Sequence, residues 1–225
     1  MSISRHSLFL VLLGLFVPVL AVTTVCAQDA SVKPGINEGY KTIEIDKAVQ
    51  RFEGSKRDIA QKTDEVIAAC QLKSGMTVAD VGAGTGLFTR LIAPKVQPEG
   101  KVYAVDITQG FLDHVLKTCK EKDIENVVGV LCTPTSTELP PDSVDLVFAC
   151  DTYHHFEYPF KMLDSIRKSL RTGGHLILID RTKASGHVRA NQEMVIKEVT
   201  AKGFKLINKS NPTGKHYLMR FEKLK

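Results

Sequence analysis

A glycine-rich loop between an expected strand and an expected helix is the feature that most constrains the fold of this chain. Residues 78–86 read VADVGAGTG, so three glycines follow directly after a short run of strand-forming residues. Glycine has no Cβ, which lets the backbone turn tightly and pass close to a ligand. A helix is expected to begin after Thr85. The pattern therefore predicts a strand–loop–helix unit with a ligand site at its turn.

Strand and helix patterns alternate from residue 76 onward. Segments 76–81, 101–105, 127–131, 144–150 and 175–179 have the character of strands, and amphipathic helical patterns separate most of them. This alternation predicts a parallel sheet with helices on both faces. The runs 144–150 and 175–179 are almost wholly apolar, as is typical of central strands covered on both sides.

The C-terminal part departs from this alternation. After a helix expected near 189–202, the strand-like segments 204–208 and 216–221 flank the turn-forming residues Asn211-Pro212-Thr213-Gly214. This arrangement predicts two antiparallel strands joined by a turn. The expected fold is α/β, a Rossmann-like three-layer sandwich with a mostly parallel sheet and an antiparallel C-terminal hairpin.

The first 27 residues differ in composition from the rest. Arg5 is the only charged residue among them, residues 8–20 are almost wholly apolar, and Val25-Cys26-Ala27 offers small residues near a cleavage point. This pattern predicts a signal peptide and an exported or periplasmic protein. The alternative is an uncleaved, membrane-tethering segment, since residues 8–25 approach the roughly 17 residues that span a bilayer. Residues 28–56 are expected to form a flexible leader and a short helix, and residues 57–225 the main domain.

Charge and cysteine content exclude several other classes. The net charge of +5 arises from 30 basic and 25 acidic residues without a run of one sign, so no nucleic-acid partner is expected. Four cysteines follow the N-terminal segment, at positions 70, 119, 132 and 150. Their spacings fit no metal-binding pattern, and we expect no metal site. An exported location would permit disulfides, but burial as small apolar side chains is the simpler interpretation.

The residues around the glycine loop indicate a nucleoside ligand. A dinucleotide-binding loop would carry a third glycine at position 87, where this chain has Leu87, so NAD is disfavoured. The second strand ends at Asp106, whose carboxylate can accept hydrogen bonds from a ribose diol. The alternative role for Asp106 is a cap of the following helix.

With these motifs in place, the sequence resembles the class I S-adenosylmethionine-dependent methyltransferases, especially their type 11 domains. The resemblance covers roughly residues 57–221 and rests on VADVGAGTG at 78–86, VYAVDI at 102–107, VDLVFACDTYHHF at 144–156 and LRTGGHLILID at 170–180. It implies a seven-stranded sheet whose last strand is inserted antiparallel. It also implies S-adenosylmethionine as cofactor, with the amino-acid end held by Asp80, Gly82, Ala83, Gly84 and Gly86, the ribose by Asp106 and the adenine flanked by Ile107.

One departure from the family concerns adenine. Many relatives have an acidic residue after the third strand to receive the adenine amino group, whereas this chain reads CTPTSTE at 132–138. Ser136 or a backbone group is the candidate replacement.

Candidate catalytic residues follow the fourth strand, because ligands of open α/β sheets bind beyond the carboxyl ends of the strands. Asp151, His154 and His155 lie there, and a histidine can accept a proton near neutral pH. The alternative is that one histidine packs in the core while the other caps a turn. Solvated surface positions are the favoured interpretation of Arg181 and Arg189, with recognition of an anionic substrate as the alternative.

Two functions follow from these residues. The first is methyl transfer to a small-molecule acceptor. The alternative is a non-catalytic nucleoside-binding or interaction module on a methyltransferase scaffold, since fold alone does not establish activity.

Overall fold

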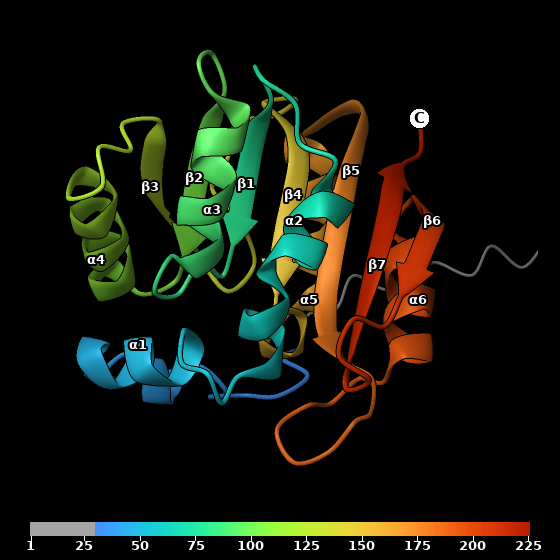
Figure 1. Cartoon of the computed structure of the whole chain (residues 1–225). Helices are drawn as coiled ribbons and strands as arrows, with labels where there is room; N and C mark the ends of the chain where they lie inside the picture. Colours follow the sequence, from blue (N-terminus) through green and yellow to red (C-terminus); the bar gives the residue numbers. More distant parts are fainter. Residues whose placement is uncertain (1–29) are drawn as a thin grey trace, which may run out of the picture.

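The computed structural model describes residues 30–225, and the expected signal peptide at 1–27 lies outside them. A seven-stranded sheet forms the centre of the molecule (Figure 1), in the order β3-β2-β1-β4-β5-β7-β6. The strands are β1 (Thr77–Val81), β2 (Lys101–Asp106), β3 (Val127–Leu131), β4 (Val144–Cys150), β5 (Leu170–Arg181), β6 (Phe204–Ser210) and β7 (His216–Lys223).

The helices are α1 (Ile45–Phe52), α2 (Thr63–Cys70), α3 (Leu87–Val96), α4 (Gln109–Lys120), α5 (Pro159–Ser169) and α6 (Gln192–Ala201). Short 3₁₀ turns lie at Glu38–Tyr40, Asp58–Lys62 and Tyr153–His155. Among residues 30–225, no helix combines the length and the apolar character needed to cross a bilayer.

The topology confirms the predicted Rossmann-like fold. Strands β3, β2, β1, β4 and β5 pair in parallel, and β7 pairs antiparallel with both β5 and β6. The last strand is thus inserted between β5 and β6, and the sheet closes in the expected hairpin.

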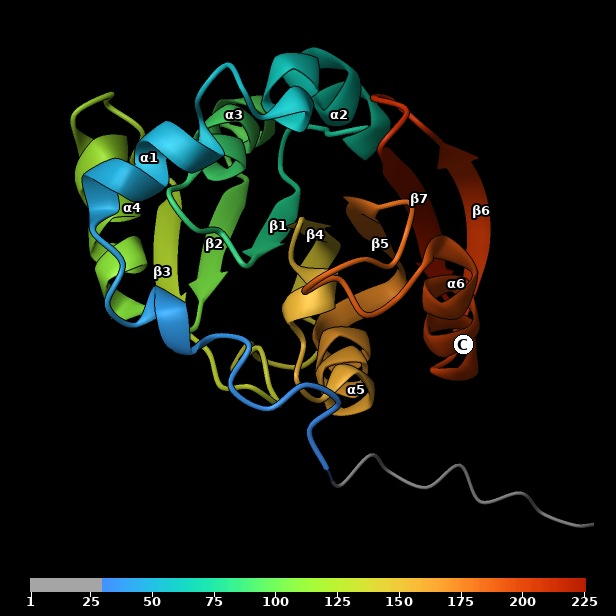
Figure 2. The ribbon, with the colours of Figure 1, turned by 90° about the horizontal axis from the view of Figure 1, so that it is seen from below.

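Alternation along the strands builds the three layers. Val78 packs with α2 and α3 in one buried cluster, whereas its neighbour Ala79 packs with α5 and α6 in another. Side chains of a strand point to opposite faces in turn, so each strand contributes to both clusters. Figure 2 shows α2, α3 and α4 on one face of the sheet and α5 and α6 on the other.

The N-terminal segment lies across the carboxyl ends of the strands. Val32 N donates to Glu157 O at 2.8 Å, and Asn37 Nδ2 donates to His155 O at 3.1 Å. These contacts join the segment to the loop that follows β4. Polar groups of this segment are therefore paired with that loop, and the division of the chain into a leader at 28–56 and a domain at 57–225 stays a prediction.

Candidate functional site

One cavity of about 510 Å³ lies at the carboxyl ends of β1, β2 and β4. Its volume falls within the range of roughly 300–1,000 Å³ that is typical of small-molecule sites. The wall includes the glycine loop after β1, the end of β2 and the segment after β4. This is where an open α/β sheet is expected to bind its ligand.

The glycine loop has no room for side chains at two positions. A Cβ added to Gly82, whose φ is +73°, would lie 2.3 Å from Thr152 Cγ2. A Cβ on Gly86, with φ +84°, would lie 2.8 Å from Val115 Cγ2. Both φ values belong to the left-handed region, in which residues with a Cβ are strained. The packing of Thr152 and Val115 against the loop therefore requires glycine at both positions, and close approach of a ligand to this backbone stays a prediction.

Asp106 lies where β2 meets this loop and is 6% exposed. Gly84 N donates to its Oδ2 at 2.9 Å, and Thr108 N donates to its Oδ1 at 2.9 Å. Burial raises the pKa of Asp106, while these backbone hydrogen bonds oppose the rise. A carboxylate oxygen has two lone pairs, so each oxygen keeps one acceptor position for the hydroxyls of a ligand.

Asp80, near the end of β1, is a second buried carboxyl in the cavity wall. Thr89 Oγ1 donates to its Oδ2 at 2.6 Å. Burial raises the pKa of Asp80 to about 6, and the hydrogen bond from Thr89 limits that rise. Asp80 thus changes charge close to neutral pH, beside the loop that is expected to hold a cationic cofactor.

The helix α1 closes the cavity on the side of the glycine loop. A Cβ on Gly84 would lie 3.6 Å from Phe52 Cδ2, which places this ring against the loop. Arg90 Nη2 donates to both carboxylate oxygens of Glu53, at 2.7 and 2.8 Å. This ion pair, in which one nitrogen donates to both oxygens, fixes the end of α1 to α3, and Phe52 is thereby held over the cofactor end of the cavity.

The opposite wall includes Ile107, Cys132, Thr133 and Pro134. Ile107 lies where the family resemblance places a residue beside adenine. Ser136 does not line the cavity, because its hydroxyl contacts Ser165 Oγ at 3.4 Å. The candidate adenine contacts are therefore the backbone and side chains of residues 132–134.

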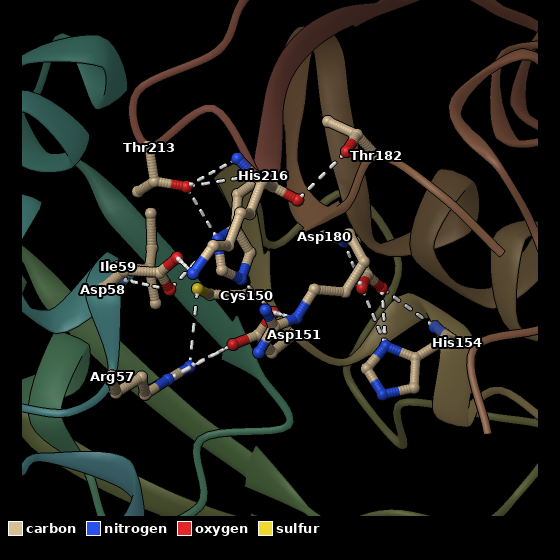
Figure 3. A network of polar contacts seen from close by, with 12 residues as sticks. Arg57, Asp58, Ile59, Cys150, Asp151, His154, Asp180, Thr182, Thr213 and His216 are labelled. Carbon is tan, nitrogen blue, oxygen red and sulfur yellow. Dashed lines mark hydrogen bonds and ion pairs between the residues drawn. The ribbon is translucent and has the colours of Figure 1, made fainter. Parts of the chain in front are cut away.

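Asp151 lies at the centre of an ionic network rather than free in the cavity (Figure 3). Arg57 donates to its Oδ2 from Nε at 3.2 Å and from Nη2 at 3.0 Å, and His216 Nε2 lies 3.0 Å from its Oδ1. Burial alone would raise the pKa of Asp151, but His216 and Arg57 outweigh it and hold the pKa well below its ordinary value. The carboxylate stays ionised, which makes it a weak proton acceptor.

His154 is held by a second carboxylate. Its ring Nδ1 lies 2.7 Å from Asp180 Oδ1 and 2.9 Å from Oδ2, and its backbone N donates to Oδ2 at 3.0 Å. His154 and Asp180 are 5% and 2% exposed. The pair fixes the tautomer, with a proton on Nδ1, and leaves Nε2 as the available acceptor of the ring.

His155 follows His154 in the same 3₁₀ turn and also lines the cavity. Burial, together with the neighbouring His154 and His187, lowers the pKa of His155 to about 3. Its ring is thus neutral at physiological pH. Both histidines line the cavity, and His154 is also buried, as the alternative of one packed histidine expects.

His187 joins these two rings, and the sequence did not predict that convergence. It lies in the loop between β5 and α6, with its ring centroid 5.0 Å from that of His154 and 6.0 Å from that of His155. Burial and its positive neighbours lower the pKa of His187. The only signal was its place after the carboxyl end of β5.

The two candidate arginines separate in the structure. Arg181 lines the cavity, whereas Arg189 does not. Arg189 donates from Nη1 and Nη2 to the two carboxylate oxygens of Glu198, at 2.9 and 2.8 Å. The guanidinium of Arg189 is therefore occupied by a bidentate partner on α6, so of the two candidates only Arg181 can meet a ligand in this cavity.

The residues beside the glycine loop suit S-adenosylmethionine in their chemistry. The carboxyl groups of Asp80 and Asp106 line the cavity beside the glycine loop, whereas Arg51 and Arg181 line it elsewhere. The bare backbone of Gly82 and Gly84 allows close approach, and Asp106 keeps acceptor positions for a diol.

The cysteines at 70, 119, 132 and 150 are unpaired.

Comparisons with known proteins agree with this geometry. Residues 79–178 match the family described as "Methyltransferase domain". The chain is 30% identical over 111 residues to the highly reducing polyketide synthase aurA of Calcarisporium arbuscula, a match that covers 48% of this chain and 4% of that synthase. It is 25% identical over 162 residues to the ubiquinone/menaquinone biosynthesis C-methyltransferase UbiE of Shewanella baltica, covering 64% of each protein.

The fold is also found among solved structures. A SAM-dependent methyltransferase from Aquifex aeolicus superposes with a TM-score of 0.71 at 21% identity, covering 81% of this chain and all of that one. The chain therefore spans only a small part of the synthase it matches but the whole of this smaller enzyme. With the matched segment, the strand order and the cavity taken together, the chain contains a methyltransferase domain of the class I S-adenosylmethionine-dependent family.

Proposed function

We propose that this protein transfers a methyl group from S-adenosylmethionine to a small-molecule acceptor. The observation that carries the proposal is the continuity of the cavity. The same cavity is lined by the glycine loop and Asp106 at one end and by His154, His155 and His187 at the other. Donor and acceptor would therefore share one space, which is the arrangement that a direct transfer requires.

The N-terminal segment and α1 cover the cavity, and this cover favours a small acceptor. Asn37, Tyr40 and Phe52, from the N-terminal segment and α1, line the cavity together with the strand ends. Tyr40 OH lies 3.4 Å from His155 Nε2, so this cover reaches the acceptor end as well. A bulky polymer would have to displace the N-terminal segment to reach the histidines, whereas a small molecule would not.

The chemistry needs little beyond alignment. The sulfonium of S-adenosylmethionine supplies a methyl group that an acceptor lone pair can attack in line, with the electrons of the broken C–S bond passing to sulfur. We assign binding of the methionine part to Asp80 and residues 82–86, and of the ribose to Asp106. His154 and His155 face the acceptor, whereas Asp151 positions Arg57 and the end of β4.

The proposal is tested with the full chain and S-adenosylmethionine carrying a labelled methyl group, incubated with an ultrafiltered small-molecule extract. We expect label to appear in small-molecule products, and to be lost with Asp106→Asn but retained with the exposed-site control Asp64→Asn. Label found only in macromolecules would contradict a small acceptor. Binding of the cofactor without any transfer would favour the non-catalytic binding module.

We further propose that the protein acts outside the cytosol. Support comes from Arg5 and the apolar residues 8–20, which lie outside the described part of the chain. Mass spectrometry of the protein recovered from cells should find a mature N-terminus near residue 28. An intact Met1 on a cytosolic protein would contradict this location, and an intact Met1 in a membrane fraction would favour tethering.

A further inference from the structure

We infer that His154, His155 and His187 form a binding site for a divalent first-row transition-metal ion, of which Zn²⁺ is the representative, at the acceptor end of the cavity. Each histidine offers one ring nitrogen, and the three nitrogens lie within 4.8 Å of one another. Three histidines with an open fourth position form a known ligand set of catalytic zinc. The expectation of no metal site rested on the cysteine spacings, whereas His187 lies far along the chain from the other two histidines.

The three nitrogens lie farther apart than the ligands of a bound ion do, so the site must contract when an ion binds. Zn–N bonds of about 2.0–2.1 Å place the nitrogens of a tetrahedral site roughly 3.3 Å apart. The nitrogens must therefore approach by up to about 1.5 Å, starting from separations of at most 4.8 Å. His187 is exposed and can supply this movement by side-chain rotation, whereas His154 is buried and fixed.

Asp180 supplies the outer contact that metal-binding histidines commonly have. A ligating histidine often donates its second ring N–H to a carboxylate, which sets the tautomer and orients the ring. His154 Nδ1 lies 2.7 and 2.9 Å from the two oxygens of Asp180. Figure 3 shows the other ring nitrogen of His154 pointing away from Asp180.

His155 carries an unsatisfied nitrogen. Its Nε2 lies 3.4 Å from Tyr40 OH, whereas its Nδ1 is buried and has no hydrogen-bond partner among the described residues. An unpaired buried polar atom is costly, and coordination of a metal ion would satisfy it. A proton on Nε2 shared with Tyr40 leaves Nδ1 as a ligand atom.

His187 comes from a loop that other contacts define. The backbones of Ser185 and Val188 exchange two hydrogen bonds of 3.0 Å, which forms a tight turn with His187 near its tip. Lys33 Nζ donates to the carbonyl oxygens of Gly186 and His187, at 3.2 and 2.8 Å. The N-terminal segment thus holds the turn that brings the third histidine to the other two.

The role of the ion rests on the proposed function. Arg51 and Arg181 line the same cavity, and with the metal they favour an anionic ligand. The acceptor class that fits is a molecule with an acidic O–H or S–H group, which loses its proton to solvent on binding and presents the resulting oxygen or sulfur lone pair to the methyl group. No protein base is then required.

The test uses the untagged full chain, stripped with a chelator, dialysed and titrated with Zn²⁺ by calorimetry. We expect a single ion to bind per chain. His187→Gln, at an exposed position that leaves the fold intact, should abolish this binding, and Asp180→Asn should weaken it roughly 10–100-fold. The matched control His114→Gln, on α4 outside the cavity, should bind Zn²⁺ as the wild type does. Unchanged affinity in His187→Gln, or no binding by the wild type, would overturn the inference.

Co²⁺ provides the second measurement. The Co²⁺-loaded protein should show the visible absorption of a low-coordinate histidine site, and azide should alter that spectrum if a coordination position is open. A spectrum unaffected by azide would contradict a role in acceptor binding. S-adenosylmethionine binding is measured separately on the stripped protein, so loss of the metal site and loss of the methyltransferase function are distinguishable.

Discussion

His216 Nε2 lies 3.0 Å from Asp151 Oδ1, a polar contact that joins the start of β7 to the end of β4. His216 is fully buried, and its Nδ1 contacts Thr213 Oγ1 at 2.9 Å. The C-terminal hairpin is therefore connected directly to the wall of the cavity. Arg57 completes the network from the segment that precedes α2, so three distant parts of the chain meet at one carboxylate.

Removing the charge of Asp151 should destabilise the protein while preserving its backbone. Asp151 has φ +52°, a value that asparagine also tolerates, so Asp151→Asn isolates the charge. We expect a loss of roughly 3–5 kcal/mol in the free energy of unfolding at pH 7, because Arg57 and His216 lose their buried partner. Unfolding by urea measures this loss of free energy. Asp142→Asn is the control, since Asp142 also has positive φ but stays largely exposed in its ion pair with Lys223. Equal losses in the two variants would contradict the assignment.

The same carboxylate should give the protein a marked sensitivity to acid. The pKa of Asp151 is held below its ordinary value in the folded state, whereas the unfolded chain titrates near about 3.9. The stabilisation is thus complete above about pH 5 and is lost as the pH falls further. Between about pH 5 and about pH 2 the difference in stability between wild type and Asp151→Asn should shrink, with most of the change below about pH 4. A constant difference would contradict this linkage.

Much of this network could not be predicted from the sequence. Asp151 was a candidate catalytic residue because it follows an apolar strand. A carboxylate that serves only in an ion pair can occupy the same position. Its partners Arg57 and His216 come from segments whose approach depends on how β7 inserts beside β5. The sequence around Asp151 therefore determines neither its contact with Arg57 nor its contact with His216. Residues 78–86 were predictable for the opposite reason, since strand, glycine turn and helix start are all encoded within nine consecutive residues.

Among the three histidines of the cavity, two positions could likewise be predicted from the sequence and one could not. The position of His154 and His155 beyond β4 followed from the apolar run that ends at Cys150, and the structure places both at the cavity. The approach of His187 depends on a loop held by Lys33, from the opposite end of the chain. The ion pair of Arg189 with Glu198 has the same origin, because it depends on how α6 packs against the domain.

Gly82→Ala should abolish cofactor binding through a steric effect. An added Cβ would lie 2.3 Å from Thr152, so the loop or the end of β4 must move. Gly173→Ala is the matched control, because Gly173 has φ +75° but no atom within 4 Å of an added Cβ. We expect the control to cost about 1 kcal/mol of stability from backbone strain alone and to bind S-adenosylmethionine normally. Calorimetry measures S-adenosylmethionine binding by both variants. Normal binding by Gly82→Ala would contradict the proposed role of residues 82–86 in holding the cofactor.

The affinity for S-adenosylmethionine should rise with pH. Burial raises the pKa of Asp80 to about 6, so this carboxyl gains its negative charge between about pH 5 and 7. A cationic ligand binds the ionised form better, which predicts a dissociation constant that falls over this interval and then levels off. Asp80→Asn should flatten the profile, whereas the exposed control Asp64→Asn should not. An unchanged profile in Asp80→Asn would assign the titration to another group.

Phe52 should contribute to cofactor retention as part of the cover. Its ring lies against Gly84 and lines the cavity. We expect Phe52→Ala to weaken S-adenosylmethionine binding about tenfold and to speed its dissociation, since an aromatic contact of this kind is worth about 1.4 kcal/mol. Lys47→Ala, on the exposed face of the same helix, is the control. Equal affinity in both variants would show that α1 does not cover the bound cofactor.

The most direct test of the central assignment is calorimetric titration of S-adenosylmethionine into the wild-type chain, Asp106→Asn and Asp64→Asn, with NAD as the competing ligand. We predict binding of one S-adenosylmethionine by the wild type and by Asp64→Asn, a loss of about tenfold or more in Asp106→Asn, and no heat with NAD. Binding of NAD by the wild type, or S-adenosylmethionine binding that is indifferent to the charge at Asp106, would contradict it.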